Sequence, residues 1–490
     1  MVLGDSLAKI LSNAGYQVEV HNYIDDTGVQ VADVAVGFLF LGEKEDPNVK
    51  FDHLCGEIYV RVNKEYERNP SLISKREFVM KEIERREGEI ASFVKKMCEK
   101  VVKANLETCW SLNIFYDLLT WESDILAAGM FEEAISKAIE SGAATIAEEG
   151  QYRGCLVARV EIDEGEESEK VLVRSNGTIT YTGKDLAYQM WKLGLLKRDF
   201  YFKPWGKQPN GKILWTTTSS KTDFKTSFGK ADIVINVIDV RQSFPQKVIY
   251  EIIRKMGFEK EYSNCIHYAY EVVGLTTSTA EKCGIKLSEK DKKKSIIHMS
   301  GRRGIYITVD KLLQITREKA LEEILKRGFA SSTEEAEKIA NDIAIAALKY
   351  SMLKVAPEKV IAFDIDEATS FEGNTGPYLQ YSHARASRIL EKSSFSKLSP
   401  PGSFKFDHSL EIELIKKIGE YPEIAEQAAK DLRPHYIATY CYELSTIFSS
   451  FYEFLPVLKA ESEEKKLSRL SLVLAYKSTI AKALNLLGIS

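Results

Sequence analysis

The chain has 490 residues, 44% of which are hydrophobic, and a formal net charge of −4 at pH 7. A chain of this length and composition is a soluble globular protein with roughly three domains at ~150 residues each. Because positive and negative charges nearly balance, the net charge does not attract a polyanion to the protein as a whole. A nucleic acid would therefore have to bind to local basic patches.

The cysteine content and the N-terminus bear on the cellular location. The 7 cysteines include no C-x-x-C pair, which disfavours a zinc ribbon, and they outline no disulfide framework. The N-terminus lacks the regions of a signal peptide, and no apolar run reaches the length of a membrane span. We therefore expect a cytoplasmic protein without a membrane partner and without a protein-bound metal ion.

The first residues predict part of a βαβ unit that begins with its helix. Apolar residues of DSLAKILSNAGY share one helical face, and QVEVHNY continues as a strand. Asn22, Asp25 and Asp26 then lie near the carboxyl end of that strand, where open α/β sheets bind ligands. Turn chemistry is an equally good explanation, because Asn and Asp both favour turns.

The segment from about residue 43 to residue 166 has a different character. It is rich in charged helical stretches, such as FVKKMCEKVVKANLETCW with the spacing of a packed amphipathic helix. It shows no run of buried strands. We interpret it as an insertion that splits a nucleotide-binding fold.

A hairpin and a helix follow. Asn176-Gly177, between VLVRS and TITYT, predicts the hairpin turn. It delivers Tyr181 and Asp185 to the start of the helix, where a phenol and a carboxylate can hold a planar cation by hydrogen bonds. A capping box of Thr182 and Asp185 explains the carboxylate equally well.

Two further stretches complete the predicted sheet. ADIVINVIDV is a nearly continuous apolar run, typical of a central parallel strand buried on both faces. Gln242 follows it, either as an amide that faces a ligand or as an ordinary polar residue at a strand end. SIIHMSGRRGIYITVD predicts a glycine-containing loop and then a strand in which Ile305, Ile307 and Val309 share a face.

The two adjacent arginines of that loop, Arg302 and Arg303, suit the phosphates of a nucleotide. A solvated basic turn is the alternative. Beyond Asp310 the chain is predicted to be helical, with a helix start at Ser332, a break at Pro400-Pro401-Gly402 and a final helical bundle. The aromatic residues of RPHYIATYCYELSTIFSSFYEF would either stack on unpaired bases or form a core.

Two long stretches, FDIDEATSFEGNTGPYLQYSHARASRIL and DLRPHYIATYCYELSTIFSSFYEFLPVL, resemble arginyl-tRNA synthetases, and HNYIDDTGVQVAD is similar to the archaeal-type branch of that family. The resemblance spans essentially the whole chain. It implies an α/β plus all-α architecture. The expected parts are a Rossmann-like catalytic domain at 1–310 with a connective insertion at about 43–166, a helical stem at 311–375 and an α-helical anticodon-binding domain at 376–490.

The resemblance also implies roles for individual residues. Arginine would be bound by Asn22, Tyr181, Asp185 and Gln242. The ATP loop would comprise His298, Met299, Ser300, Gly301 and Arg302, with Ser300, Arg302 and Arg303 as its catalytic groups; His298, Gly301 and Arg302 depart from the family's Lys-Met-Ser-Lys-Ser pattern. The tRNA would contact Arg433, His435, Tyr436 and Tyr440.

The implied reaction joins arginine to tRNA(Arg) through an arginyl-adenylate, and it uses ATP with Mg²⁺ as a substrate. The resemblance also implies that tRNA binds before arginine is activated and that the protein is a monomer. The chain as numbered begins after the family's N-terminal domain and its His-x-Gly-His segment, so we expect it to form the adenylate poorly. The alternatives are a truncated, non-catalytic tRNA-binding paralogue and a class I synthetase for another amino acid.

Overall fold

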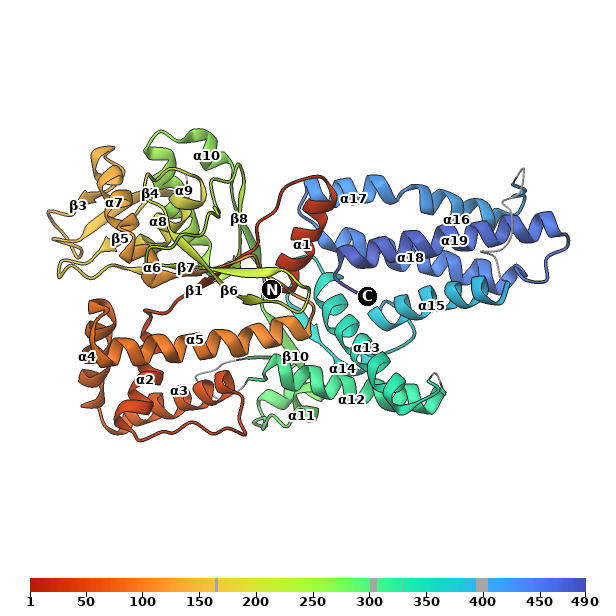
Figure 1. Cartoon of the computed structure of the whole chain (residues 1–490), viewed down its shortest axis with the longest axis horizontal. Helices are drawn as coiled ribbons and strands as arrows, with labels where there is room; N and C mark the ends of the chain where they lie inside the picture. Colours follow the sequence, from red (N-terminus) through yellow and green to blue (C-terminus); the bar gives the residue numbers. More distant parts are fainter. Residues whose placement is uncertain (164–165, 300–305, 329, 394–403) are drawn as a thin grey trace. The chain divides into compact units, whose positions relative to one another are not determined.

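The chain divides into two compact units, and Figure 1 labels many of their helices and strands. The computed structural model describes residues 1–163, 166–299, 306–328, 330–393 and 404–490. The first unit, which we call the sheet unit, comprises Glu19–Ser111 and Phe115–Glu271. The second, the C-terminal unit, comprises Met1–Val18, Leu112–Ile114 and Val272–Ser490.

The main sheet of the sheet unit is 4-stranded, in the order β1-β2-β7-β6. Its strands are β1 (His21–Ile24), β2 (Leu118–Trp121), β6 (Tyr201–Lys207) and β7 (Ile213–Thr218). β1, β2 and β7 are parallel, and β6 runs antiparallel at one edge. The register pairs Asn22 with Leu119 and Tyr23 with Thr120.

Helices cover both faces of this sheet, as parallel strands require. Leu119 belongs to one apolar core and the adjacent Leu118 belongs to the other. The helices of the first core are α2 (Val29–Phe40), α3 (Phe51–Arg68), α4 (Leu72–Arg85) and α5 (Gly88–Ser111). Those of the second are α6 (Glu122–Ala127), α7 (Met130–Glu140), α8 (Tyr181–Lys192) and α9 (Ser243–Lys255).

The expectation that residues 43–166 contain no buried strand is wrong. β2 lies inside that range, pairs with both β1 and β7, and has all of its residues buried. The run LLTW is only four residues long, so it is too short to stand out from the surrounding helical periodicity.

Smaller sheets complete the unit. Their elements are β3 (Thr145–Ile146), β4 (Leu156–Asp163), β5 (Glu166–Val173), β8 (Val234–Asp239), β9 (Cys265–Tyr270), η1 (Val240–Gln242) and α10 (Glu259–Ser263). β8 belongs to a 2-stranded sheet with β9 and is only partly buried beyond Val234. The prediction of a central strand buried on both faces is therefore wrong, because an apolar run does not reveal how many neighbours a strand has.

The predicted hairpin turn is present, but its second strand is not. Gly177 has a φ of 81°, which is the conformation that favours glycine at such a turn. Among the described residues, the ladder after the turn is a single bridge between Val173 and Ile179, and α8 begins two residues later. The chain therefore enters α8 almost directly after the turn, without a full second strand.

The C-terminal unit combines a 3-stranded sheet with a helical bundle. The strands, in the order β11-β10-β12, are β10 (Val273–Thr276), β11 (Ile296–His298) and β12 (Ile361–Phe363). The remaining elements are α1 (Val2–Asn13), α11 (Thr277–Lys282), η2 (Asp291–Lys293), α12 (Val309–Arg327), α13 (Thr333–Leu353), α14 (Ile365–Ala368), α15 (Gly376–Ser393), α16 (Ser409–Gly419), α17 (Tyr421–Lys430), α18 (Pro434–Phe454) and α19 (Glu463–Leu486).

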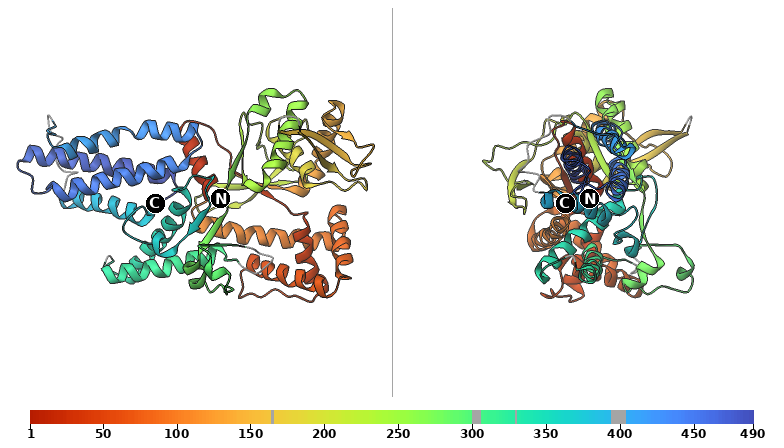
Figure 2. Two further views of the ribbon diagram at one scale, coloured as in Figure 1. Left: turned by 180° about the vertical axis from the view of Figure 1, so that it is seen from behind. Right: turned by 90° about the vertical axis from the view of Figure 1, so that its right-hand side faces the viewer.

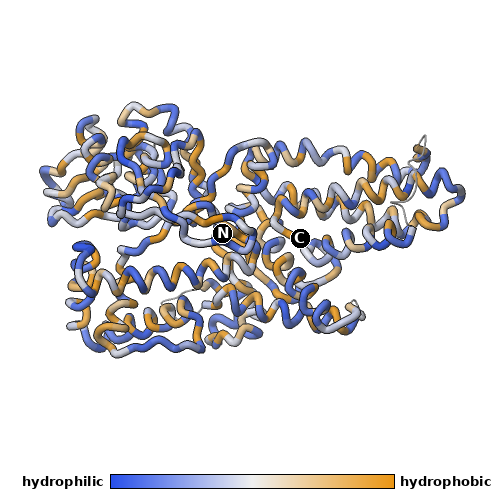
Figure 3. The backbone as a smooth tube through the Cα atoms, viewed as in Figure 1, coloured by the Kyte–Doolittle hydropathy of each residue, from blue (hydrophilic) through white to orange (hydrophobic). Residues whose placement is uncertain are grey.

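Figures 1 and 2 show α15, α16, α18 and α19 side by side in both directions of view, and α18 and α19 are in contact. Hydrophilic and hydrophobic stretches alternate along these helices in Figure 3, as expected of amphipathic helices around a shared core. The helix start predicted at Ser332 is confirmed, because the Ser332 hydroxyl accepts the backbone N–H of Glu335. Within the described ranges, no helix is both long and apolar enough to cross a membrane.

The strand predicted around residues 305–309 is wrong where it can be compared. Residues 306–308 are not in a strand, and Val309 is the first residue of α12. Thr308 caps this helix, with its side-chain oxygen accepting the backbone N–H of Lys311 at 3.2 Å. Residues 300–305 and the predicted break at Pro400-Pro401-Gly402 lie outside the described residues.

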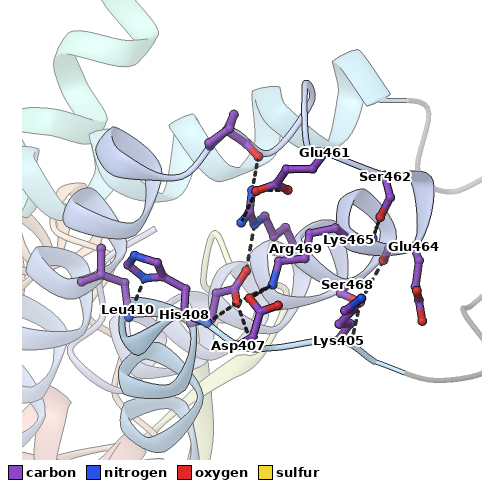
Figure 4. A network of polar contacts seen from close by, with 12 residues as sticks. Lys405, Asp407, His408, Leu410, Glu461, Ser462, Glu464, Lys465, Ser468 and Arg469 are labelled. Atoms are coloured by element: carbon purple, nitrogen blue, oxygen red, sulfur yellow. Dashed lines mark hydrogen bonds and ion pairs between the residues drawn. The ribbon is translucent and has the colours of Figure 1, made fainter.

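A buried ionic cluster ties α16 to α19 in the bundle. Glu411 has no exposed surface, and its carboxylate accepts hydrogen bonds from Arg469 Nε at 2.8 Å and from Lys465 Nζ at 3.0 Å. The backbone N–H groups of Asp407 and His408 also donate to it, each at 3.1 Å. Figure 4 shows Lys465 and Arg469 near Asp407 and His408. Burial alone would raise the pKa of Glu411, but these donors bring it down to about 2.

Candidate functional site

Acidic side chains gather at the carboxyl ends of β1 and β2. Asp25 and Asp26 follow β1, Glu122 follows β2 as the first residue of α6, and Asp185 is contributed by α8. β1 and β2 are adjacent and parallel, so their carboxyl ends lie at the same edge of the sheet. Open α/β sheets bind ligands at this edge.

Glu122 is the most enclosed member of this group, with 3% of its surface exposed. Its Oε2 accepts the hydroxyl of Tyr23 at 2.8 Å. Its Oε1 accepts Lys184 Nζ at 2.6 Å and the hydroxyl of Thr27. Residues of β1, the following turn and α8 therefore fix the orientation of this carboxylate.

Asp26 supports Glu122 indirectly. Its two carboxylate oxygens accept the backbone N–H of Ser123 at 2.9 Å and the Ser123 hydroxyl at 2.6 Å. These bonds hold the start of α6, where Glu122 is located, against the end of β1. Burial raises the pKa of Asp26 to about 6, although the bonds from Ser123 oppose the shift.

Asp185 carries the strongest electrostatic signal of the group. Burial and then the charge of Glu122 raise the pKa of Asp185 to about 7, while Lys192 and Tyr23 act in the opposite direction. Tyr23 donates its hydroxyl to Glu122 and interacts electrostatically with Asp185. A partly buried acid whose charge is disfavoured in this way is typical of a site that receives a cation.

The capping explanation for Asp185 is wrong. The residue that caps α8 is Thr180, whose side chain accepts the backbone N–H of Gly183 at 3.4 Å. The hydroxyl of Thr182 is buried and has no hydrogen-bond partner among the described residues. Since α8 starts earlier than a Thr182–Asp185 box requires, the carboxylate of Asp185 is left for another role.

Lys192 lies two turns further along α8. Its Nζ donates to Asn236 Oδ1 at 2.6 Å and lies 4.7 Å from the centre of the Tyr188 ring. Burial lowers the pKa of Lys192 to about 8, against the opposing influence of Asp185. Lys192 thus adds a positive charge that interacts with Asp185.

The structure brings together only some of the residues predicted to bind arginine. Tyr181 and Asp185 share α8, but Tyr181 is 49% exposed and its hydroxyl accepts Lys170 Nζ at 3.1 Å. Gln242 is exposed at the end of η1. Lys170 lies over the rings of both Tyr181 and Phe244, so the segment after Gln242 is a neighbour of the start of α8.

Asn22 lies apart from this group. It pairs with Leu119, which belongs to the core covered by α2–α5, whereas Tyr23 pairs with Thr120 on the opposite face. Because side chains alternate along a strand, Asn22 points to the face of the sheet that Asp185 does not share.

Of the predicted ATP loop, only its first two residues are described. His298 ends β11 and is exposed, and Met299 is 40% exposed. Ser300, Gly301, Arg302 and Arg303 lie outside the described residues.

The residues predicted to contact tRNA have different environments. Tyr440 is 2% exposed, and its hydroxyl donates to the carbonyl of Lys417 at 2.9 Å, so the base-stacking prediction is wrong for this side chain and the core alternative holds. Tyr436 is partly buried, and the His435 ring lies edge-on to it at 4.8 Å. Arg433 pairs with Glu358.

A cleft of about 890 Å³ in the C-terminal unit was not predicted. At its wall, the guanidinium carbon of Arg385 lies 4.8 Å from the centre of the Tyr381 ring and 5.0 Å from that of Tyr452. Its lining comes from α13, α15, α18, α19, the segments before α15 and after α18, and the last residue, and includes Phe371, His383, Arg388, Lys392, Leu458 and Lys459. It offers aromatic planes and positive charge together.

The sequence reasoning missed Tyr23, Glu122 and Lys184. Glu122 could have been found from its position, because LLTW is a short, mostly apolar run directly followed by an acidic residue, and the predicted strand ending in HNYI is likewise directly followed by Asp25. Lys184 carries no comparable signal. A lysine on a predicted helix is ordinarily solvated, and only the fold shows where its amine is directed.

Comparison with known proteins agrees with this architecture. The family model described as "tRNA synthetases class I (R), catalytic domain" matches residues 1–202 and 207–364, and that described as "DALR anticodon binding domain" matches residues 379–490.

Arginine–tRNA ligases are similar over the whole chain. That of Thermococcus sibiricus is 38% identical and that of Deinococcus radiodurans 34%, with all of this chain covering 76% and 78% of their lengths. The solved arginyl-tRNA synthetase of Thermus thermophilus superposes with a TM-score of 0.85 at 34% identity, covering 100% of this chain and 78% of that one. The chain therefore belongs to the arginyl-tRNA synthetase family of class I aminoacyl-tRNA synthetases.

Proposed function

We propose that the chain catalyses the arginine–tRNA ligase reaction and that Tyr23, Glu122 and Asp185 form the pocket for the guanidinium group of arginine. The observation that carries the pocket assignment is the pair of interacting carboxylates, the buried Glu122 and the partly buried Asp185, with the Tyr23 hydroxyl donating to Glu122. The whole-chain similarity to arginine–tRNA ligases supports the reaction.

The chemistry of the pocket favours a guanidinium over other side chains. A guanidinium is planar, always charged and has five N–H donors, so it can serve two carboxylates at once. An apolar substrate side chain would bring no charge to Asp185 and would displace water from it, which is costly. A pocket that pairs with a charged group strongly rejects analogues that lack the charge.

The remaining predicted contacts keep separate roles in this proposal. Tyr181 and Gln242, both exposed near the start of α8, would close over the bound amino acid. Asn22 would contact a part of the substrate that reaches the other face of the sheet, since its position does not suit the guanidinium.

The reaction needs no nucleophilic side chain. A carboxylate oxygen of arginine attacks the α-phosphorus of ATP, and the bond from that phosphorus to the pyrophosphate oxygen breaks. A ribose hydroxyl of tRNA then attacks the carbonyl carbon of the arginyl-adenylate, the bond from that carbon to the phosphate oxygen breaks, and AMP and the hydroxyl proton are released. Catalysis relies on positioning and on stabilisation of phosphate charge. ATP enters as its Mg²⁺ complex, and Ser300, Arg302 and Arg303 are the proposed groups that stabilise the leaving pyrophosphate.

The proposed domains follow the predicted boundaries with one change. The catalytic domain is placed at 1–310, the stem at 311–375 and the anticodon-binding domain at 376–490. We end the connective insertion before β2, because that strand belongs to the main sheet. Both candidate sites are built from residues of one chain, which suits a monomer. The proposed reaction is a step of translation, which takes place in the cytoplasm.

The cleft beside Arg385 is the proposed site for an unpaired base of tRNA. Guanidinium and aromatic planes accept any base by stacking, and positive side chains favour the phosphate backbone. Arg433, His435 and Tyr436 remain predictions for a second contact. Tyr440 is not part of this proposal, because its side chain fills the core.

Replacing Arg385 by alanine is expected to weaken tRNA(Arg) binding about tenfold or more, since stacking is worth roughly 1–3 kcal/mol per base. Filter binding at fixed salt measures the change. Arg385→Lys keeps the charge and loses the plane, so it should recover only part of the affinity. Full recovery in the lysine variant would contradict stacking and assign Arg385 a purely electrostatic contact.

The function itself is tested by pyrophosphate exchange into ATP in the presence of tRNA(Arg). Arginine should support exchange, and citrulline, which carries a neutral urea in place of the guanidinium, should not. Tight binding of tRNA(Arg) without any arginine-dependent exchange would instead favour a non-catalytic tRNA-binding protein.

A further inference from the structure

Lys184 is directed into the carboxylate group rather than into solvent. Its side chain is 14% exposed, and the Glu122 side chain that it pairs with is 4% exposed. Its Nζ lies 2.6 Å from Glu122 Oε1 and 2.8 Å from the hydroxyl of Thr27. The amine therefore bonds to two acceptors on different elements.

Each element around the pocket contributes titratable groups. Those facing Glu122 and Asp185 are Tyr23 from β1, Asp25 and Asp26 from the turn after it, and Lys184 and Lys192 from α8. Asp26 is held by Ser123, and Lys192 by Asn236. Glu122 is the carboxylate that has a direct ion pair with Lys184.

We propose that Lys184 is a positioning residue that acts as the internal counter-ion of Glu122 in the empty pocket, leaving Asp185 as the carboxylate that receives the charge of the guanidinium. This inference rests on the proposed function of the pocket. With Lys184 paired to Glu122, one carboxylate of the pocket is left for a ligand that carries a single positive charge.

The physical basis is the repulsion between neighbouring carboxylates. Two enclosed carboxylates cannot both remain ionised without a cation, so one of them keeps a proton. Lys184 supplies the cation for Glu122. Asp185 has no ion pair among the described residues; Lys192 opposes the shift, but burial and Glu122 still raise the pKa of Asp185 to about 7. Without Lys184, the repulsion between the two carboxylates would lack this ion pair, so the pair would hold a second proton that arginine would have to displace.

The test is the number of protons released when the full chain binds arginine at pH 6. Isothermal titration calorimetry in buffers of different ionisation enthalpy measures this number. The wild type should release about one proton per arginine, since a group with a pKa near 7 is mostly protonated at pH 6. The proton comes from Asp185 and goes to the buffer.

Lys184→Met should release about two protons, because the two carboxylates, without their ion pair, would together hold a second one. Lys184→Arg should behave as the wild type, and the double variant Glu122→Gln with Lys184→Met should return to about one. Lys137→Met is the matched control: Lys137, in α7 of the same unit, donates to the carbonyl of Leu195 and should leave the number unchanged.

The outcomes separate this inference from the proposed function. A folded Lys184→Met that releases the same number of protons as the wild type would overturn the counter-ion role. Lys184→Gln, which keeps a donor of similar length, replaces it if the methionine variant does not fold. A wild type that binds citrulline as well as it binds arginine would instead overturn the pocket assignment.

Discussion

Replacing Asp185 by asparagine is expected to raise the dissociation constant for arginine by about 10²- to 10⁴-fold, because removing one partner of a buried ion pair costs about 3–5 kcal/mol. The amide keeps the shape of the carboxylate and loses the charge that the guanidinium needs. Equilibrium dialysis with labelled arginine measures the change directly.

The affinities for ATP and tRNA(Arg) should be nearly unchanged in this variant, since neither substrate needs the charge of Asp185. Asp223→Asn is a suitable control, because Asp223 is an exposed carboxylate of the same unit. Equal losses of affinity for arginine, ATP and tRNA would mean that Asp185 supports the fold of the unit, and the pocket assignment would then fail.

The second large effect concerns stability. Replacing Glu411 by glutamine should destabilise the bundle by about 3–5 kcal/mol, since Arg469 and Lys465 would be left buried without their shared carboxylate. Amide hydrogen exchange in α16 and α19 reports this loss. Glu413→Gln, an exposed change on the same helix, should alter stability by less than about 0.5 kcal/mol.

The pH dependence of the bundle checks the same cluster. The pKa of Glu411 lies near 2 in the fold, below its ordinary value of 4.5. A carboxyl group whose folded pKa is depressed stabilises the fold above the unfolded pKa and loses that contribution as the pH falls through the folded one. Protection of α16 and α19 should therefore fall between pH 4.5 and 2, and less steeply in Glu411→Gln.

The position of the tryptophans provides an internal control for both measurements. All 5 tryptophans of the chain lie in the sheet unit. Their fluorescence during urea unfolding should be the same in Glu411→Gln as in the wild type. A shift of that transition would show that the cluster stabilises more than the bundle.

The sequence predicted the long elements of the fold well because their signals are local. The apolar face of α1, with Leu7 and Ile10 buried, and the cap at Ser332 can each be read from neighbouring residues. β2 escaped prediction because a four-residue strand gains its stability from β1 and β7, which are distant in sequence. The burial of β8 was overestimated because it, too, depends on neighbouring strands that are distant in sequence.

The candidate site was only partly predictable. Asp185 could be singled out from its spacing with Tyr181, but its environment depends on Glu122, which lies 63 residues earlier in the chain. Lys184 is adjacent to Asp185 in sequence, yet its role depends on the direction of one amine. Tyr440 shows the converse, since a tyrosine that stacks on a base and a tyrosine that fills a core look the same in sequence.

The most direct test of the account is a comparison of arginine and citrulline binding to the wild type and to Asp185→Asn. The wild type should prefer arginine by about 10²-fold or more, since a site built for a charged group rejects its neutral analogue. In the variant, most of this preference should disappear. If Asp185→Asn bound both ligands more weakly but kept the full preference for arginine, the guanidinium would not be recognised by Asp185, and the central claim would be contradicted.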